Sequence, residues 1–190
     1  MIYEINKSVF DKFPEIDSKN LLYRNITPED CNEIFKIRSN DKVMTYLDTT
    51  KHNSVEDSKK MIEAVIESYK NKTGINWAII KKESRAFVGY FGYWRIITEH
   101  CRAEIGYALK PEYWGQGIMA ETLTAMIEFG FNTLMLHSIE ANVNPGNTAS
   151  IKVLEKAGFK KEAYFRENFL FDNKFLDSII YSLLEKDLHK

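Results

Sequence analysis

The stretch that decides the fold is AEIGYALKP (residues 103–111), which is followed by YWGQGIMA (residues 113–120). It predicts a strand, then a loop with two glycines, then the first turn of a helix. Gly115 and Gly117 can adopt positive φ, so successive backbone N–H groups can converge on an anion at the helix N-terminus. A pyrophosphate suits such a site. Taken alone, the two glycines are explained more readily by a tight strand-to-helix turn, so the rest of the sequence must decide.

Two common phosphate motifs do not match this loop. A P-loop needs Lys and then Ser or Thr directly after its last glycine, whereas Ile118 and Met119 follow here. Ala120 supplies the third small residue of a dinucleotide fingerprint, but the loop lies two thirds along the chain, after an expected hairpin. A Rossmann domain is therefore a poor fit, and a general nucleotide-binding module is a weak alternative.

Hydrophobic periodicity and turn residues place the other elements around this loop. Before it we expect strands over 21–26, 75–81, 86–97 and 102–109, and helices from Thr27 to about Ser39 and from Ser54 to near Tyr69, with a surface loop over 46–52. After it we expect a helix from Gly117, a strand over 138–143, a helix over 147–157 and a hairpin of 159–171 with 175–184. No repeat or linker divides the chain, so we expect one domain over residues 1–190, of which 1–19 form an N-terminal extension.

Composition excludes several classes of protein. The chain has 190 residues and is 44% hydrophobic, enough for one buried core. Its net formal charge is −1 with both signs scattered, which argues against a nucleic-acid partner. Cys31 and Cys101 have no metal-ligand spacing, so we expect neither a metal site nor a disulfide. No run of about 18 apolar residues occurs, so we expect no membrane segment and a cytoplasmic protein.

Three motifs together resemble the GNAT superfamily of N-acetyltransferases, in particular its ribosomal-protein N-terminal (RimJ/RimL-like) branch. They are the strand and loop of residues 103–117, NPGNTAS at 144–150 and LEKAGF at 154–159. Their order and spacing match, and the resemblance extends over about residues 20–187. It implies an α/β (α+β) fold in which a mixed, mostly antiparallel, twisted sheet of about seven strands is flanked by about four helices.

The resemblance also implies where acetyl-CoA binds. In the family the cofactor lies where two parallel strands splay, here 102–109 and 138–143, and Gly106 either marks a bulge there or packs beneath an aromatic ring. Backbone groups on the strand would bond the pantetheine arm, amides of the loop would hold the pyrophosphate, and the Asn147 side chain would bond the pantetheine or the acetyl end. The cofactor-binding residues so implied are Tyr107, Ala108, Leu109, Trp114, Gly115, Gln116, Gly117, Ile118, Met119, Ala120, Asn144 and Asn147.

The chain also departs from the family pattern. Some relatives use a tyrosine and a glutamate as acid and base at positions occupied here by Leu154 and Asn142. That pair cannot be carried over. The departure keeps a second class of function open, a non-catalytic acyl-CoA-binding sensor.

The chemistry does not require strong replacements for that pair. A thiol leaves readily with a pKa of about 8.5, and an α-amine with a pKa of about 7.7–8.0 is partly neutral, so direct attack in a ternary complex suffices. We expect Glu104 to take the amine proton, or else to be a strand carboxylate paired with Arg102 or Arg95. Ser150 either orients the thiolate or only aids the helix cap. Cys101 is expected to be a buried structural thiol.

The acceptor is the least determined part. The branch resemblance suggests a protein N-terminal α-amine, and a polyamine, amino sugar or antibiotic is the alternative. The loop 46–52 and three aromatics, Tyr90, Tyr93 and Trp94, either line an acceptor pocket or fill the core. The partners expected are acetyl-CoA and an amine, and the protein is a monomer or a homodimer.

Overall fold

The computed structural model describes residues 3–188, which form one eight-stranded sheet and five α-helices. The strands are β1 (Ile16–Asp17), β2 (Leu21–Asn25), β3 (Ile75–Lys81), β4 (Phe87–Ile97), β5 (Arg102–Leu109), β6 (Ser138–Val143), β7 (Lys160–Phe171) and β8 (Lys174–Leu184). The helices are α1 (Cys31–Arg38), α2 (Asp41–Met44), α3 (Val55–Lys70), α4 (Ile118–Glu128) and α5 (Thr148–Lys156). The expected mixed α/β GNAT architecture is confirmed.

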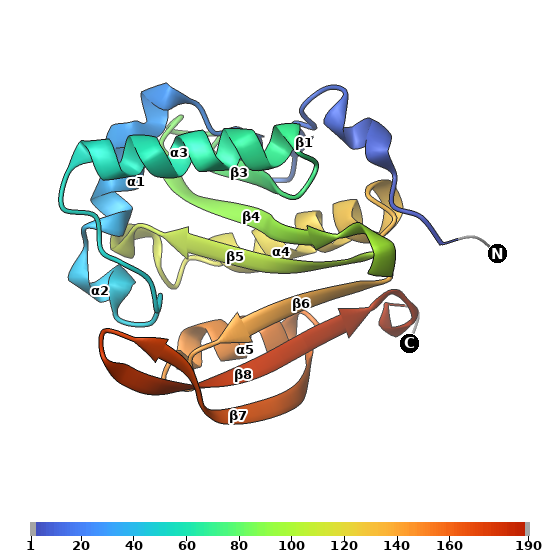
Figure 1. The fold of residues 1–190 in the computed structure, drawn as a ribbon. Coiled ribbons are helices and arrows are strands. Elements are labelled where there is room, and N and C mark those ends of the chain that lie inside the picture. Colours follow the sequence, from blue (N-terminus) through green and yellow to red (C-terminus); the bar gives the residue numbers. More distant parts are fainter. Residues whose placement is uncertain (1–2, 189–190) are drawn as a thin grey trace.

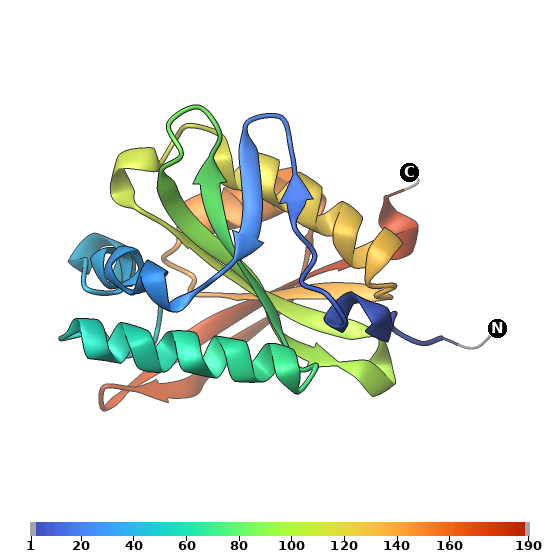
Figure 2. The ribbon, with the colours of Figure 1, turned by 90° about the horizontal axis from the view of Figure 1, so that it is seen from above.

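The sheet has a hydrophobic core on each face. Helices α1 and α3 cover one face, and α4 and α5 cover the other (Figures 1 and 2). Ile34 of α1 and Ile62 of α3 are buried against strands β3 and β4 on the first face. Leu123 of α4 and Leu154 of α5 are fully buried in the larger core on the second. None of the helices within residues 3–188 is long and apolar enough to cross a membrane.

Two elements exceed the expected number. Strand β1 is the eighth strand, and it falls in the segment predicted as an N-terminal extension. It is defined by its pairing with β2, in which Ile16 lies opposite Tyr23. Two residues are too few to show a periodic pattern in the sequence. Helix α2 is the fifth helix, and it is a single turn started by Asn40, whose side chain accepts from the Lys42 N–H.

The predicted helix starts agree with local capping chemistry. Thr27 and Asp30 form a capping box, but the first turn, Pro28–Asp30, is a 3-10 turn, and α1 follows it. Ser54 and Asp57 form a second capping box at α3. Pro28 and the early acids therefore mark the start of the first helix correctly, and only its first turn differs in type.

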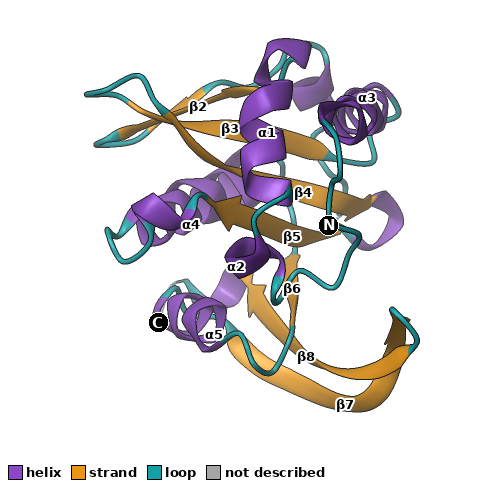
Figure 3. Cartoon of the chain, turned by 90° about the vertical axis from the view of Figure 1, so that its left-hand side faces the viewer, coloured by secondary structure: helices purple, strands orange, loops and turns teal. Residues whose placement is uncertain are grey.

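The strand order along the sheet is β1-β2-β3-β4-β5-β6-β8-β7, and every described neighbour is antiparallel except β5 and β6. These two parallel strands pair only from Arg102 with Ser138 to Glu104 with Glu140, although both continue further. They then separate, which is the predicted splay. Strand β8 lies between β6 and β7, so the apolar segment 178–184 is an internal strand. The β7–β8 hairpin curves away from the body of the sheet (Figure 3).

The bulge expected at Gly106 lies on the neighbouring strand. The register shift falls between Tyr93 and Arg95 of β4, so Trp94 is the extra residue. A Cβ on Gly106 would lie 3.3 Å from the Trp94 ring, so this glycine packs beneath an aromatic. Trp94 is exposed, whereas Tyr90 and Tyr93 are buried, which places those two tyrosines in the core.

Candidate active site

A cavity of about 420 Å³ opens where β5 and β6 separate. Four segments enclose it: α2 with its following loop, the end of β5, the glycine loop with the start of α4, and the start of α5. Its walls are formed by Lys42, Val43, Tyr46, Leu47, Tyr107, Ala108, Leu109, Tyr113, Trp114, Gly115, Gly117, Ile118, Met119, Ala120, Asn147, Ala149, Ser150 and Val153. Ten of the twelve residues predicted to bind the cofactor, all except Gln116 and Asn144, thus line one cavity.

The glycine loop has the backbone predicted for it. Gly115 has φ 72° and Gly117 has φ 77°, both in the left-handed region. No other heavy atom lies within 4 Å of a Cβ built on either residue, so backbone conformation rather than lack of space calls for glycine here. Gly117 is the N-cap of α4, and the N–H groups that follow it lack partners within the helix. These amides can receive an anion.

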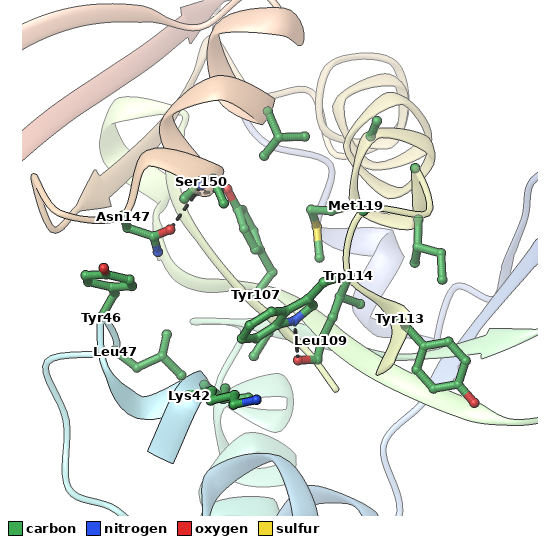
Figure 4. Close-up of a pocket in the computed structure, with 18 residues that line it drawn as sticks. Lys42, Tyr46, Leu47, Tyr107, Leu109, Tyr113, Trp114, Met119, Asn147 and Ser150 are labelled. Carbon is green, nitrogen blue, oxygen red and sulfur yellow. Dashed lines mark hydrogen bonds between the residues drawn. The ribbon is translucent and has the colours of Figure 1, made fainter. Parts of the chain in front are cut away.

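The side chain of Gln116 does not face the cavity. Its Nε2 donates to the Glu112 carbonyl oxygen at 2.7 Å, across the base of the loop. The cofactor role predicted for Gln116 thus rests on its backbone amide. Trp114 is held in a similar way, because its Nε1 donates to the Leu109 carbonyl oxygen at 3.0 Å. Figure 4 shows the Trp114 ring extending between Leu47 and Met119, toward Tyr107.

The splay leaves one edge of β5 unpaired beside the cavity. Residues 105–109 of β5 pair with β4 on one side, but their pairing with β6 has ended at Glu104. Backbone groups that point toward β6 are therefore available to an extended ligand, which could pair with them as a strand would. Tyr107 and Ala108 lie on this edge and line the cavity. This geometry fits the pantetheine arm implied by the resemblance.

Three polar side chains meet at the start of α5. Asn147 is its N-cap, and its Oδ1 accepts from the Ser150 N–H at 3.1 Å. The Ser150 hydroxyl contacts the Tyr107 hydroxyl at 2.8 Å, so it does more than aid the cap (Figure 4). Burial raises the pKa of Tyr107 to about 12, and the hydrogen bond with Ser150 opposes that rise. Tyr107 is therefore a neutral hydroxyl throughout the ordinary pH range.

Glu104 lies at the point where the parallel strands part, outside the cavity wall. Its side chain is 12% exposed and pairs with Arg95 at 2.8 Å, the alternative that the sequence left open. Burial raises the pKa of the Glu104 carboxyl, Arg95 lowers it, and the neighbouring Glu140 raises it. Its role as a base stays a prediction.

Asn144 also lies outside the cavity wall. Its Nδ2 donates to the carboxylate of Asp48, and its Oδ1 accepts from the Gly146 N–H at 2.9 Å. Because the side-chain amide is used within the protein, the structure gives no support to the cofactor contact predicted for Asn144.

The sequence did not predict several of the residues that line the cavity. Lys42 and Val43 come from the single-turn helix that periodicity did not detect, and Tyr113, Ala149 and Val153 flank predicted residues. The Asn40 cap before Lys42 was the available signal.

The comparisons with known proteins agree with this geometry. A family model described as an acetyltransferase (GNAT) domain matches residues 20–160. The chain belongs to the GNAT family. It is 34% identical to the uncharacterized N-acetyltransferase YoaA of Bacillus subtilis over 91% of this chain and 98% of that protein. It is an acetyl-CoA-dependent N-acetyltransferase.

Two other relatives place it within the family. It is 27% identical to the [ribosomal protein uS5]-alanine N-acetyltransferase of Escherichia coli over 64% of this chain and 63% of that protein. A crystal structure of a GNAT-family acetyltransferase from Bacillus anthracis superposes with a TM-score of 0.81 and 28% identity, covering 91% of this chain and 99% of the other. Relatives of the ribosomal-protein branch are thus among its homologues.

Proposed function

We propose that this enzyme acetylates a protein N-terminal α-amine, as in the ribosomal-protein type, by direct attack of the amine on acetyl-CoA in a ternary complex. The observation that carries the proposal is the charge of the cavity wall, because the acceptor amine must reach the acetyl end of the cofactor within the same cavity. Of the described residues that line it, none is Asp or Glu, and Lys42 is the one charged side chain. A polyamine carries several positive charges and needs carboxylates around it. A protein N-terminus that enters as a single neutral amine needs no such carboxylates.

The uS5-alanine N-acetyltransferase supports the same acceptor class, because that relative is named for acetylating an alanine of a ribosomal protein. The cavity chemistry and this relative are independent supports. A small, singly charged amine such as an amino sugar is the second candidate, since it too would tolerate an apolar cavity.

The donor would be bound mainly by backbone. The amides of 115–120 would hold the pyrophosphate at the N-terminus of α4, and the free edge of β5 would pair with the pantetheine. The Oδ1 of Asn147 is already used in its cap, so its Nδ2 is the group that can donate to the cofactor.

The hydroxyl groups of Tyr107 and Ser150, called the hydroxyl pair below, would place a hydrogen-bond donor near the thioester. Tyr107 is half-buried, and the partner within reach of its O–H is Ser150 Oγ, at 2.8 Å. If Tyr107 donates to Ser150, the Ser150 hydrogen is left to point into the cavity. The departing thiolate, whose conjugate acid has a pKa of about 8.5, cannot take a proton outright from a tyrosine whose pKa is about 12. The pair therefore stabilises the departing thiolate by hydrogen bonding and leaves its protonation to solvent.

The remaining steps need no covalent intermediate. The amine nitrogen attacks the thioester carbon, the C–N bond forms, the C–S bond breaks and the thiolate departs. The proton lost by nitrogen passes through water to Glu104, the proposed base. Cys101 is buried at the opposite end of β5 and lines no part of the cavity, which supports direct attack.

The experiment has two stages. Calorimetric titration with acetyl-CoA, CoA and ATP tests the donor site, and we expect the two CoA compounds to bind and ATP to bind far more weakly. Thiol release is then followed with peptides that have free or acetylated N-termini, with spermidine and with glucosamine. Release that depends on the free α-amine supports the proposal, and release driven only by spermidine or glucosamine refutes it.

Tyr107→Phe tests the hydroxyl pair. Phe keeps the stacking of this ring on Phe91, whose centroid lies 6.3 Å away, so only the hydroxyl is lost. We expect kcat to fall about three- to tenfold, the value of one hydrogen bond, with the KM for acetyl-CoA unchanged. An unchanged kcat would exclude the pair from the chemistry.

A further inference from the structure

Asp48 and Asn144 join two walls of the cavity that are 96 residues apart in sequence. Asn144 Nδ2 lies 3.1 Å from Asp48 Oδ1 and 3.2 Å from Oδ2. Asp48 directly follows Tyr46 and Leu47, which line the cavity, and Asn144 lies in the turn that leads to Asn147. Both partners are half-buried, and one is charged, so the contact is stronger than an exposed neutral pair.

Asn144 also shapes the turn before α5. Its Oδ1 accepts from the Gly146 N–H, and its backbone carbonyl accepts from the Asn147 N–H, both at 2.9 Å. Asn147 in turn caps α5 through Ser150, and Ser150 contacts Tyr107. A continuous series of hydrogen bonds therefore runs from Asp48 through Asn144 to the hydroxyl pair.

The two walls also touch through Tyr46. A Cβ on Gly146 would lie 2.8 Å from Cε1 of the Tyr46 ring, so the ring rests directly on this glycine. Figure 4 shows Tyr46 beside Asn147. On its other side the loop is held by Arg38, whose guanidinium donates to Thr49 and to the Thr50 carbonyl. The hydrogen bonds between Asp48 and Asn144, called the bridge below, thus link the loop after α2 to the β6–α5 turn beside the cavity.

We propose that Asp48 and Asn144 are positioning residues for acetyl transfer. Their bridge closes the α2 loop onto the β6–α5 turn, and it fixes Asn147 and Ser150 against the thioester. This inference rests on the proposed function, because it assigns the bridge to the same cavity. Asn144 would then act through Asn147 and Ser150, without touching the cofactor itself.

A reciprocal exchange tests the bridge. Asn144→Asp places two carboxylates face to face, which repel each other. Asp48→Asn keeps a neutral acceptor opposite the amide of Asn144. In the double variant the amide introduced by Asp48→Asn can donate to the carboxylate introduced by Asn144→Asp, so the bridge is restored with its polarity reversed. The second oxygen of that carboxylate can still accept from the Gly146 N–H.

We expect Asn144→Asp to lower kcat about tenfold or more while the KM for acetyl-CoA changes less than about threefold. Asp48→Asn alone should cost less than about threefold, and the double variant should recover kcat to within about threefold of the unmodified enzyme. Asn132→Asp, which adds the same charge at an exposed position outside the cavity wall, is the matched control and should leave kcat unchanged. Thermal unfolding of each variant checks that it is folded.

A double variant no better than Asn144→Asp would overturn the proposal, as would an unchanged kcat in Asn144→Asp. A large loss of CoA affinity in Asn144→Asp that the exchange does not restore would also overturn it, because Asn144 would then be a direct cofactor ligand. Failure of the proposed function looks different, since the unmodified enzyme would then bind no CoA or would not use an α-amine.

Discussion

Gly117→Ala isolates the contribution of backbone conformation to the cofactor loop. Gly117 has φ 77° at the N-cap of α4, and a Cβ there meets no other heavy atom within 4 Å. The substitution therefore adds no clash, and its whole cost is that of placing an L-residue in the left-handed region. That cost is about 1–2 kcal/mol.

The cost appears in one of two measurements. If the loop keeps its conformation, the free energy of unfolding falls by that amount, and the melting temperature falls by roughly 2–8 °C for a chain of this size. If the loop relaxes to negative φ, stability is retained and the Kd for CoA rises, by about 5- to 30-fold at most. Calorimetric titration with CoA gives the loss of binding free energy, and thermal unfolding of the same preparation gives the loss of unfolding free energy. The two losses should add up to about 1–2 kcal/mol.

Gly117→Asn is the matched control, because asparagine tolerates the left-handed region better than alanine. We expect it to lie between glycine and alanine in both measurements. If Gly117→Ala bound CoA and unfolded like the unmodified enzyme, positive φ would not be required at this loop. If Asn were worse than Ala, side-chain size and not backbone conformation would be the cause.

Three further substitutions test other parts of the structure. Glu104→Gln should lower kcat and leave the Kd for CoA unchanged, and a kcat equal to that of the unmodified enzyme would end its assignment as base. Burial raises the pKa of Glu121, but hydrogen bonds from the β1–β2 turn outweigh it and bring that pKa below its ordinary value. Glu121→Gln should therefore lower the melting temperature by a few degrees at neutral pH, and the difference should vanish as the pH falls through the folded-state pKa; a difference that persisted there would contradict the linkage. In Gly130→Ala the new Cβ would lie 2.4 Å from the Tyr93 hydroxyl, so unfolding should cost about 1–3 kcal/mol less, and Tyr93→Phe in the same background should recover part of this. No recovery on denaturant titration would point to a different clash.

Local sequence chemistry predicted most of the elements. Capping at Thr27 and Ser54, alternation along 102–109 and the glycine pair each act over a few residues, so they can be read without knowing the fold. Strand β1 and helix α2 were not predicted, because they are only two and four residues long and such lengths are too short for a periodic pattern. Of the two predictions for Gly106, packing beneath an aromatic ring is confirmed. The bulge itself lies on the partner strand, and the sequence could not place it because a bulge depends on the pairing of two strands.

The candidate site divides in the same way. Residues proposed to act through their backbone, such as Gly115 and Ala120, were predicted to line the site because their conformation or position in a motif is local. Residues that act through side chains were harder to predict. Asn144 belongs to a recognisable motif, yet its amide faces Asp48, a residue that no motif singled out.

The sequence by itself determined the family, the strand-loop-helix that can hold a pyrophosphate, and the positive φ of Gly115 and Gly117, since these follow from the intrinsic preferences of neighbouring residues. Only the tertiary structure decided that β5 and β6 part after Glu104, and that the Tyr107 hydroxyl meets Ser150. Those contacts join segments far apart in the chain. Sheet register and helix packing set them, and neither is written in any single stretch of sequence.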